Sequence, residues 1–369
     1  MPSLPHFIAC MLATAAAGFA VEPRAANSPG WIRVGGDRTG FVHEDGRVFV
    51  PWGFNYDHDR DGRLLEDYWD PEWATVEEDF REMRDLGANV VRIHLQVGRF
   101  LRGPAEPDTA ALRRLRQLVA LAERTGLHLN ITGLGCYHRA DVPAWYDALD
   151  EKSRWEAQAV FWKAVAGVCA GCPAVFCFDL MNEPILPGAD KPEGGWLAAE
   201  FGGKSFVQRI SLGLAGRRRE DVAKAWVEKL TVAIRAVDTR HLVTVGEIPW
   251  GMTFPGAKPL FSDPDIGAPL DFASIHVYPK TGEIDRALPV LRDHARGRPV
   301  LIEEIFPLSC SATELGAFMV SSRGVAAGWI GFYWGRRPEE YDRDASVANA
   351  LTRDWLELFS RLTPRMTSR

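Results

Sequence analysis

Two acidic positions at the ends of apolar runs are the first chemical signal in the sequence. The segment Phe178-Asp-Leu-Met-Asn-Glu-Pro184 places Asn182 and Glu183 where a buried strand would finish, and Glu304 follows a second apolar run. Buried polar groups cost free energy unless they have partners or a function. Two facing carboxyl groups, one protonated and one ionised, are the minimum equipment for cleaving a glycosidic bond. Glu183 and Glu304 are therefore the candidate catalytic pair.

Other candidate side chains follow the remaining apolar runs. Any one of them alone is more often a hydrogen-bonded structural group than a functional one. Amide, guanidinium, imidazole, phenol and indole groups at the ends of several runs are harder to explain by packing alone. The candidates for substrate contact are Trp52, Asn55, Arg92, His138, Asn182, His276, Tyr278 and Trp334.

The spacing of apolar residues predicts the elements that carry these side chains. Short apolar runs alternate with longer segments of helical period, which is typical of βα units and a parallel sheet. No glycine-rich G-x-G-x-x-G loop follows an early strand, so an open doubly wound sheet is the weaker alternative. We expect an α/β fold, a (β/α)8 barrel. The expected strands are 48–53, 89–94, 127–132, 174–180, 242–246, 272–276, 300–303 and 329–334.

A barrel of this kind brings the candidate residues to one face. The carboxyl ends of its strands meet at one mouth, where functional loops lie. Three βα units separate Glu183 from Glu304, so the two side chains can face each other across that mouth. The long segment 185–219 is a candidate substrate wall, and 249–269 is rich in proline and glycine and predicts no clear fifth helix.

Several of these motifs, in this order, resemble glycoside hydrolase family 5, the cellulase and mannanase group of the retaining (β/α)8 glycosidases. The resemblance covers nearly all of the chain after residue 20. It rests on Asp179–Pro184, on Arg92 within Asn-Val-Val-Arg-Ile-His, on His276-Val-Tyr278, on Pro299-Val-Leu-Ile-Glu-Glu304 and on Trp334.

The resemblance implies a role for each matching residue. Glu183 would be the general acid/base and Glu304 the nucleophile, while Asn182 would hold the sugar 2-hydroxyl. Arg92 and Tyr278 would lie against Glu304 and keep it ionised.

The remaining matches concern the sugar site. His276 would line the site near the acid, and Trp334 would offer its indole face to the sugar ring. His138 matches the family pattern less securely. Trp52 and Asn55 are further candidates for substrate contact.

One departure concerns the nucleophile. The family usually has an aromatic residue and then a glycine after it, whereas Ile305 and Phe306 follow here. Because side chains alternate along a strand, only one of Glu303 and Glu304 can point into the mouth. We assign Glu304 to the mouth and expect Glu303 to face outward or to pair with a basic neighbour.

These expectations define a function and its alternatives. We predict a retaining β-glycoside hydrolase that acts on β-mannan or β-glucan and needs no metal or organic cofactor. An exo-acting β-glycosidase or transglycosidase is the nearer alternative, and a glycan-binding barrel without activity is the more distant one. Six tryptophans near presumed loops can stack on sugars, although packing is the simpler role for each: Trp52, Trp69, Trp73, Trp145, Trp196 and Trp250.

The composition of the chain and its first twenty residues indicate where the protein acts and which partners it can bind. A formal charge of −6 and a pI near 5.9 argue against a nucleic-acid surface. Residues 1–20 resemble a signal peptide, so we expect residues 21–369 to form one secreted or periplasmic catalytic domain. No later run is long enough for a membrane span, and we expect a monomer that binds carbohydrate. Five cysteines would remain, an odd number that cannot pair completely, and we expect at most one local disulfide.

Overall fold

The computed structural model describes residues 29–343 and 346–368, and its centre is a closed barrel of parallel strands. Neighbouring strands follow chain order around the barrel, and the last pairs with the first. The prediction of a (β/α)8 barrel is confirmed. The barrel strands are β4 (Trp52–Asn55), β5 (Val90–Gln96), β8 (His128–Gly135), β9 (Val175–Asn182), β12 (Leu242–Glu247), β13 (Ala273–His276), β14 (Val300–Glu304) and β15 (Ala326–Phe332).

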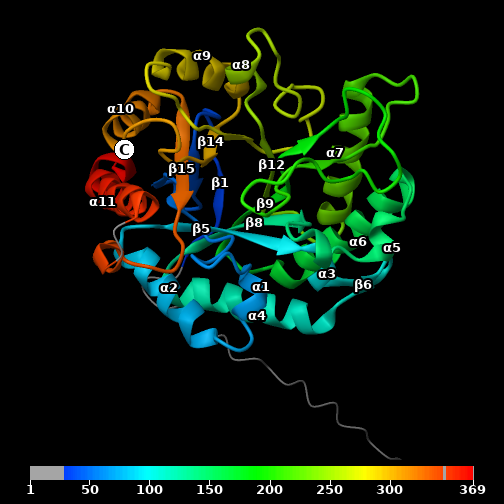
Figure 1. Cartoon of the computed structure of the whole chain (residues 1–369), viewed down its shortest axis with the longest axis horizontal. Helices are drawn as coiled ribbons and strands as arrows, with labels where there is room; N and C mark the ends of the chain where they lie inside the picture. The colour runs from blue at the N-terminus through cyan, green and yellow to red at the C-terminus, as the bar shows by residue number, and fades with distance from the viewer. Residues whose placement is uncertain (1–28, 344–345, 369) are drawn as a thin grey trace, which may run out of the picture.

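Helices surround these strands (Figure 1). The longer ones are α2 (Trp73–Asp85), α4 (Thr109–Thr125), α6 (Glu151–Cys169), α7 (Arg219–Arg235), α9 (Ile284–Ala295), α10 (Ala312–Ser322) and α11 (Val347–Thr367). Shorter elements occupy the connections: α1 (Leu65–Tyr68), α3 (Val97–Phe100), β6 (Leu101–Gly103), β7 (Glu106–Pro107), η1 (Arg139–Asp141), α5 (Ala144–Asp147), β10 (Pro184–Ile185), β11 (Gln208–Arg209), α8 (Trp250–Thr253) and η2 (Pro338–Arg343).

Local sequence sets where the helices begin and end. The Asp108 carboxylate accepts hydrogen bonds from the first backbone N–H groups of α4, and Gly126 ends that helix with φ +75°. In α10, Ser311 and Glu314 form a reciprocal capping box. Such caps satisfy backbone donors that a helix end leaves without partners, and each is worth about 0.5–2 kcal/mol.

The two connections singled out in the sequence depart from a regular repeat. Between β12 and β13 the chain forms only α8, so the expected lack of a full fifth helix is confirmed. After β9, the chain makes β10 and β11 before it enters α7. Both departures follow the carboxyl ends of strands, where they widen the walls of the barrel mouth.

A small antiparallel sheet covers the opposite end of the barrel. It consists of β1 (Ile32–Val34), β2 (Phe41–His43) and β3 (Val48–Phe49). The ring of Phe41 packs edge-on against Phe176 and Phe272, whose centroids lie 5.1 and 5.0 Å away. This second apolar cluster excludes water from the amino ends of the barrel strands.

The structure differs from the expected strand at 48–53 and from a local disulfide, and a third prediction lies outside the described residues. The strand expected at 48–53 is two strands, because β3 pairs with β2 and only β4 joins the barrel. Cys136, Cys169, Cys172, Cys177 and Cys310 are all free thiols. The signal-peptide prediction for residues 1–20 lies outside the described residues.

Within the described ranges, no helix combines the length and apolar character that crossing a bilayer requires.

Close packing between β15 and α11 predicts a cost for enlarging Gly331. A Cβ at this position would lie 1.9 Å from Cζ2 of the fully buried Trp355. We expect Gly331→Ala to lower the free energy of unfolding by about 1–3 kcal/mol, because added volume forces a packed core to shift. Denaturant unfolding measures this change. Gly324→Ala is the matched control, since a Cβ there meets no atom within 4 Å; equal effects of the two substitutions would contradict the packing argument.

Candidate active site

The end of β9 explains why polar residues follow a buried strand. Glu183 adopts a left-handed backbone conformation, with φ +48°, immediately after Asn182. Its backbone N–H donates to the Gly246 carbonyl at 3.1 Å. A non-glycine residue in this region costs about 1–3 kcal/mol and persists where the surrounding structure requires it. The sharp turn leaves the Glu183 side chain partly exposed in the barrel mouth.

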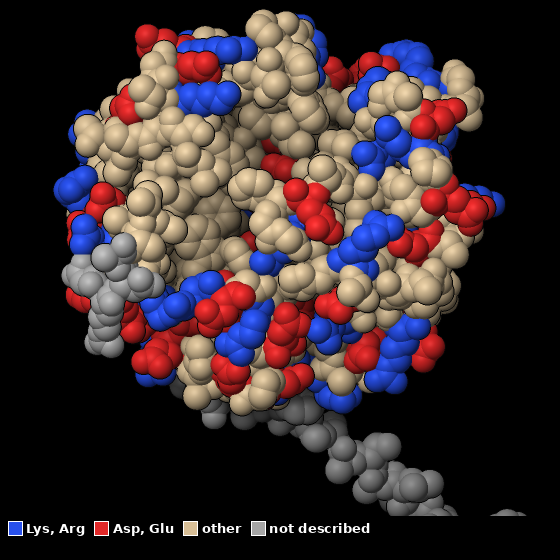
Figure 2. Space-filling model, viewed as in Figure 1, with Lys and Arg blue, Asp and Glu red and all other residues tan. Residues whose placement is uncertain are grey.

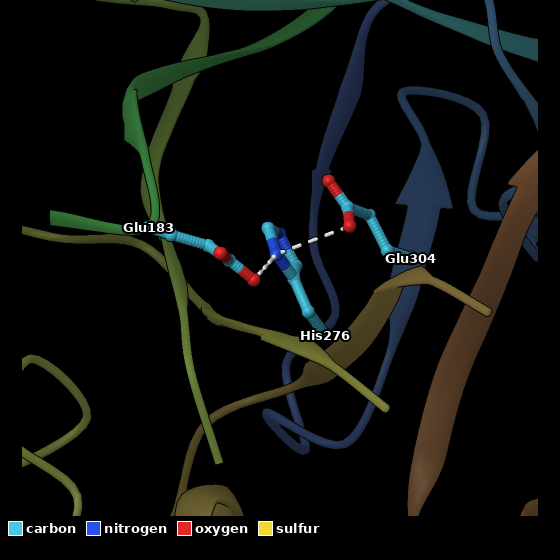
Figure 3. A group of neighbouring side chains, drawn as sticks. All are labelled: Glu183, His276 and Glu304. Atoms are coloured by element: carbon cyan, nitrogen blue, oxygen red, sulfur yellow. Dashed lines mark hydrogen bonds and ion pairs between the residues drawn. The ribbon is translucent and has the colours of Figure 1, made fainter. Parts of the chain in front are cut away.

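Glu183 and Glu304 meet across the mouth with His276 between them (Figure 3). One ligand atom from each of the three side chains lies within 4.8 Å of the others. His276 Nδ1 is 2.9 Å from Glu183 Oε1 and 3.4 Å from Glu304 Oε2. The structure therefore brings the two candidate carboxylates close enough to act on one bond.

Both carboxylate oxygens of Glu304 accept hydrogen bonds from fixed donors. Arg92 Nη1 donates to Oε1 at 2.8 Å, and the Tyr278 hydroxyl donates to Oε2 at 2.6 Å. A cation and a donated hydrogen bond both favour the charged form of a carboxyl group. The bonds also fix the direction in which the remaining lone pairs of Glu304 point.

Arg92 connects several strands at the floor of the site. Its Nη2 donates to Asp179 Oδ2 at 2.8 Å and to Asn182 Oδ1 at 2.9 Å. Its Nη1 also donates to Asn55 Oδ1 at 2.9 Å, and its Nε donates to Thr132. The guanidinium has no exposed surface, so these partners replace all of its water.

Glu303 lies beneath the mouth, inside the barrel. It is fully buried, accepts a hydrogen bond from Asn130, and has Oε1 3.6 Å from Arg92 Nε. The expectation that it faces outward is wrong, whereas the expected basic neighbour is present. The pairing of β13 with β14 shifts after Ile302, and this irregularity accompanies the inward position of both acidic residues.

His276 carries a positive charge between acidic groups. Burial alone would lower the pKa of its imidazole. The charge of Glu304 and the contacts with Glu183 and Glu303 outweigh burial and raise this pKa to about 10. At neutral pH the ring is therefore an imidazolium that can donate a hydrogen bond to Glu183.

The pKa values of two buried acids below the mouth, Glu303 and Asp179, are shifted in opposite directions. Burial favours the neutral form of Glu303, but Arg92 and His276 outweigh it and hold the pKa of Glu303 below its ordinary value. Burial and the nearby charge of Glu303 raise the pKa of Asp179 to about 6. Near neutral pH the cluster thus pairs two cations with several carboxylates, and close to pH 6 Asp179 takes up a proton.

A cavity of about 400 Å³ opens above the carboxylate pair. Figure 2 shows a recess on this face with acidic atoms at its base. Trp334 lines the cavity together with Phe306 and Phe332, and Trp334 Nε1 has no hydrogen-bond partner among the described residues. An aromatic wall beside polar groups is typical of a sugar site, because sugars combine apolar faces with hydroxyl groups.

Five of the eight predicted contact residues do not line this cavity: Arg92 and His276 are buried against the two acids, and the other three lie elsewhere. Trp52 is fully buried on the outside of the barrel, where its indole stacks on Phe359 of α11, so its prediction as a substrate contact is wrong. Asn55 is also fully buried and contacts Arg92 rather than the open space. His138 lines a separate small cavity beside Arg99.

The presumed stacking tryptophans are also mostly structural. Trp69 and Trp196 are buried, and Trp196 packs under the Arg154 guanidinium at 4.4 Å. Trp250 lines a neighbouring groove of about 720 Å³ rather than the cavity above the carboxylates.

Several residues that line the cavity were not predicted from the sequence. Asp57 and His58 follow β4 and line it, with His58 Nδ1 3.0 Å from Asp57 Oδ1. His94 also lines it, although its place near a strand end was visible in the sequence. Lys204 reaches the cavity from the segment 185–219, whose role as a wall was expected without naming a residue.

The acidic pair and His276 are the described residues closest to a metal-ligand set. Their environment does not fit a cation. Arg92 and Tyr278 already occupy the two oxygens of Glu304, and His276 is protonated. A metal ion would have to displace these donors and the proton.

Two curated proteins share part of this sequence. A probable mannan endo-1,4-beta-mannosidase A-2 from Aspergillus terreus is 26% identical over 194 residues, which are 47% of this chain and 41% of that protein. Mannan endo-1,4-beta-mannosidase F from Aspergillus clavatus is 28% identical over 222 residues, 52% of this chain and 44% of that protein. The chain thus spans less than half the length of either relative.

Structure and family comparisons agree with the barrel. A beta-1,4-mannanase from the sea hare Aplysia kurodai superposes with a TM-score of 0.60 at 15% identity, over 89% of this chain and 96% of that one. This likeness concerns the fold. The family model described as cellulase, glycosyl hydrolase family 5, matches residues 53–300, which hold most of the barrel. The chain belongs to glycosyl hydrolase family 5.

Proposed function

We propose that this protein is a retaining β-glycoside hydrolase that acts on a β-linked polysaccharide or oligosaccharide of the β-mannan or β-glucan type. The observation that carries the proposal is the approach of Glu183 and Glu304, whose nearest oxygens lie within 4.8 Å. Retaining glycosidases place their carboxyl groups about 5–5.5 Å apart, whereas inverting ones leave about 6.5–9.5 Å for a water molecule.

In the first step, Glu304 attacks the anomeric carbon. A new bond forms between a Glu304 oxygen and this carbon, and the glycosidic C–O bond breaks with its electrons moving to the leaving oxygen. Glu183 gives its proton to that oxygen. Arg92 and Tyr278 donate to the two oxygens of Glu304 and orient the carboxylate for attack.

In the second step, water replaces the leaving group. Glu183, now ionised, removes a proton from water, whose oxygen attacks the anomeric carbon and releases Glu304. His276 contacts Glu183 Oε1 at 2.9 Å and holds this carboxyl group in place while water enters. Asn182 lies beside both acids, where its side chain can bind the sugar 2-hydroxyl.

The names of the curated relatives support a substrate of the β-mannan type. Both curated relatives are named mannan endo-1,4-beta-mannosidases, and the family model is described as cellulase. An exo-acting glycosidase or a transglycosidase would use the same pair of acids. A binding barrel without activity is disfavoured, because binding alone does not require a strained Glu183 or a buried cation against Glu304.

We also propose that residues 21–369 act as one secreted or periplasmic catalytic domain, monomeric and without a metal or organic cofactor. The support for export is the composition of residues 1–20, with an apolar stretch that ends in small residues. Carbohydrate is the only partner that the proposed activity requires.

Replacing the proposed nucleophile tests whether Glu304 or Glu303, at the end of β14, attacks the sugar. We expect Glu304→Gln to reduce turnover of an aryl β-glycoside by at least about 10⁴-fold, because the amide cannot form the covalent intermediate. Release of the phenol measures the rate. Glu156→Gln, at an exposed site on α6, is the control. Full activity of Glu304→Gln together with loss in Glu303→Gln would assign the nucleophile to Glu303 instead.

Replacing the acid/base gives a different signature. We expect Glu183→Gln to slow aryl glycosides with basic leaving groups by about 10²–10⁴-fold, since these need a proton as the bond breaks. Glycosides of acidic phenols should form the intermediate at nearly the normal rate. Burst kinetics over a series of phenols measures the difference. A uniform loss across the series would show that Glu183 does not supply the proton.

A further inference from the structure

We infer that the hairpin formed by residues 197–208 closes one end of the active cavity, so that the enzyme binds the non-reducing end of a neutral β-linked hexose chain and releases single sugars. This inference rests on the proposed glycosidase function and concerns its substrate class. It begins with the hairpin itself, which extends the segment after β9.

The tip of this hairpin is built by a tight turn. Phe201 and Lys204 exchange two backbone hydrogen bonds, of 2.9 and 3.1 Å. The residues between them, Gly202 and Gly203, have φ of +58° and +76°. Positive φ at both central residues is the requirement of a type I′ turn, for which Gly-Gly is a preferred sequence. The tip therefore has one defined shape.

Contacts on both sides hold the hairpin over the site. The Ser205 backbone N–H donates to the Tyr137 carbonyl at 2.8 Å, and Asn182 Nδ2 donates to the Phe206 carbonyl at 3.1 Å. The rings of Tyr137 and Phe206 pack edge-on at 4.9 Å. Because Asn182 is next to the proposed acid/base, the hairpin is part of the site and not a distant loop.

The tip reaches across the mouth to the opposite wall. Lys204 Nζ lies so close to Gly62 that a Cβ on this glycine would be 3.1 Å from it. Gly62 follows β4, and the hairpin follows β9. In the barrel, β5 and β8 separate these two strands. The hairpin therefore spans the ends of β5 and β8 and blocks the cavity on that side.

The closed end contains polar groups suited to hydroxyls. Lys204 is 6% exposed, lines the cavity, and has no ion pair or hydrogen bond from its ammonium to any described residue. Asp57, at 4% exposed, lines the same cavity. An ammonium group that faces a cavity without a protein partner has donors free for the hydroxyl oxygens of a ligand. Asp57, Glu183 and Glu304 make the cavity unfavourable for an acidic sugar, so a neutral hexose fits best.

Space for the rest of the substrate lies on the other side of Glu183. The groove of about 720 Å³ borders Pro184 and Ile185 and is lined by the exposed rings of Trp250 and Phe254. Since Glu183 must protonate the leaving oxygen, the leaving part of a chain extends toward this groove. The chain end then occupies the smaller, closed cavity, which makes that end the non-reducing one.

The pattern of products tests this arrangement. The probe is a set of β-1,4-linked manno- and cello-oligosaccharides labelled at the reducing end. The full chain should release one unlabelled hexose at a time and leave labelled products shortened in steps of one sugar. Mixed internal fragments from the start would overturn the inference and leave the proposed function standing. Absence of hydrolysis of every β-glycoside would overturn both.

A substitution at the closed end tests the role of Lys204 as a specificity-determining residue. Lys204→Met keeps the aliphatic stem and removes the charge, and we expect KM for the labelled trisaccharide to rise about tenfold with a smaller change in kcat. Lys163→Met, an exposed position on α6, is the matched control. An unchanged KM in Lys204→Met, with the variant folded by circular dichroism, would overturn the assignment.

A shortened hairpin gives a second, independent result. Ala198 and Val207 are paired by a backbone hydrogen bond of 2.9 Å, so an Asn-Gly turn can replace residues 199–206 between them. We expect the open-ended variant to produce internal fragments from the labelled chains, whatever its rate. Release of single sugars with the hairpin removed would show that another feature sets the mode of cleavage.

Discussion

A single guanidinium without exposed surface, that of Arg92, determines how the active site is built. It contacts the carboxylates of Asp179, Glu303 and Glu304, with nearest distances of 2.8, 3.6 and 2.8 Å. A buried cation is tolerated only when charged and hydrogen-bonding partners replace water, and loss of one partner typically costs about 3–5 kcal/mol. These acids therefore have to lie near the barrel axis for the protein to fold with Arg92 inside.

This requirement links folding to the proposed catalysis. Arg92 comes from β5, Asp179 and Asn182 from β9, and Glu304 from β14, so one cation fixes the mutual positions of three strands. Glu304 accepts a hydrogen bond from the same guanidinium that also orients Asn182. Glu183, the proposed acid/base, lies outside this cluster and is held by the turn after Asn182 and by His276. The two carboxyl groups thus have different surroundings, as different roles require.

Much of this arrangement was predictable from the sequence, because strand ends in a barrel converge whatever the details of packing. That rule places Arg92, Glu183, His276 and Glu304 together without further information. It does not decide which way a side chain points. Trp52 turns outward to pack on α11, and Glu303 turns inward where the pairing of β13 and β14 shifts.

The convergence of strand ends does not predict which residues of the connecting loops enter the site. Lys204 enters the cavity only because the Gly202-Gly203 turn reverses the chain at that point, and Asp57 only because the chain bends after β4. In the sequence, Lys204 is marked only by the Gly-Gly turn before it, and Asp57 only by its place in a polar pair with His58. Neither reveals which wall of the barrel a loop will face, since long connections are positioned by tertiary contacts.

The central claim is that Glu304 attacks the sugar while Glu183 protonates the leaving oxygen. The most direct measurement is trapping of the covalent intermediate with a 2-deoxy-2-fluoro β-glycoside that carries an activated leaving group, followed by mass spectrometry of the digested protein. The account predicts one fluorosugar per chain, attached to Glu304. A label on Glu303 or Glu183, or hydrolysis of the reagent with inversion and no labelled peptide, would contradict it.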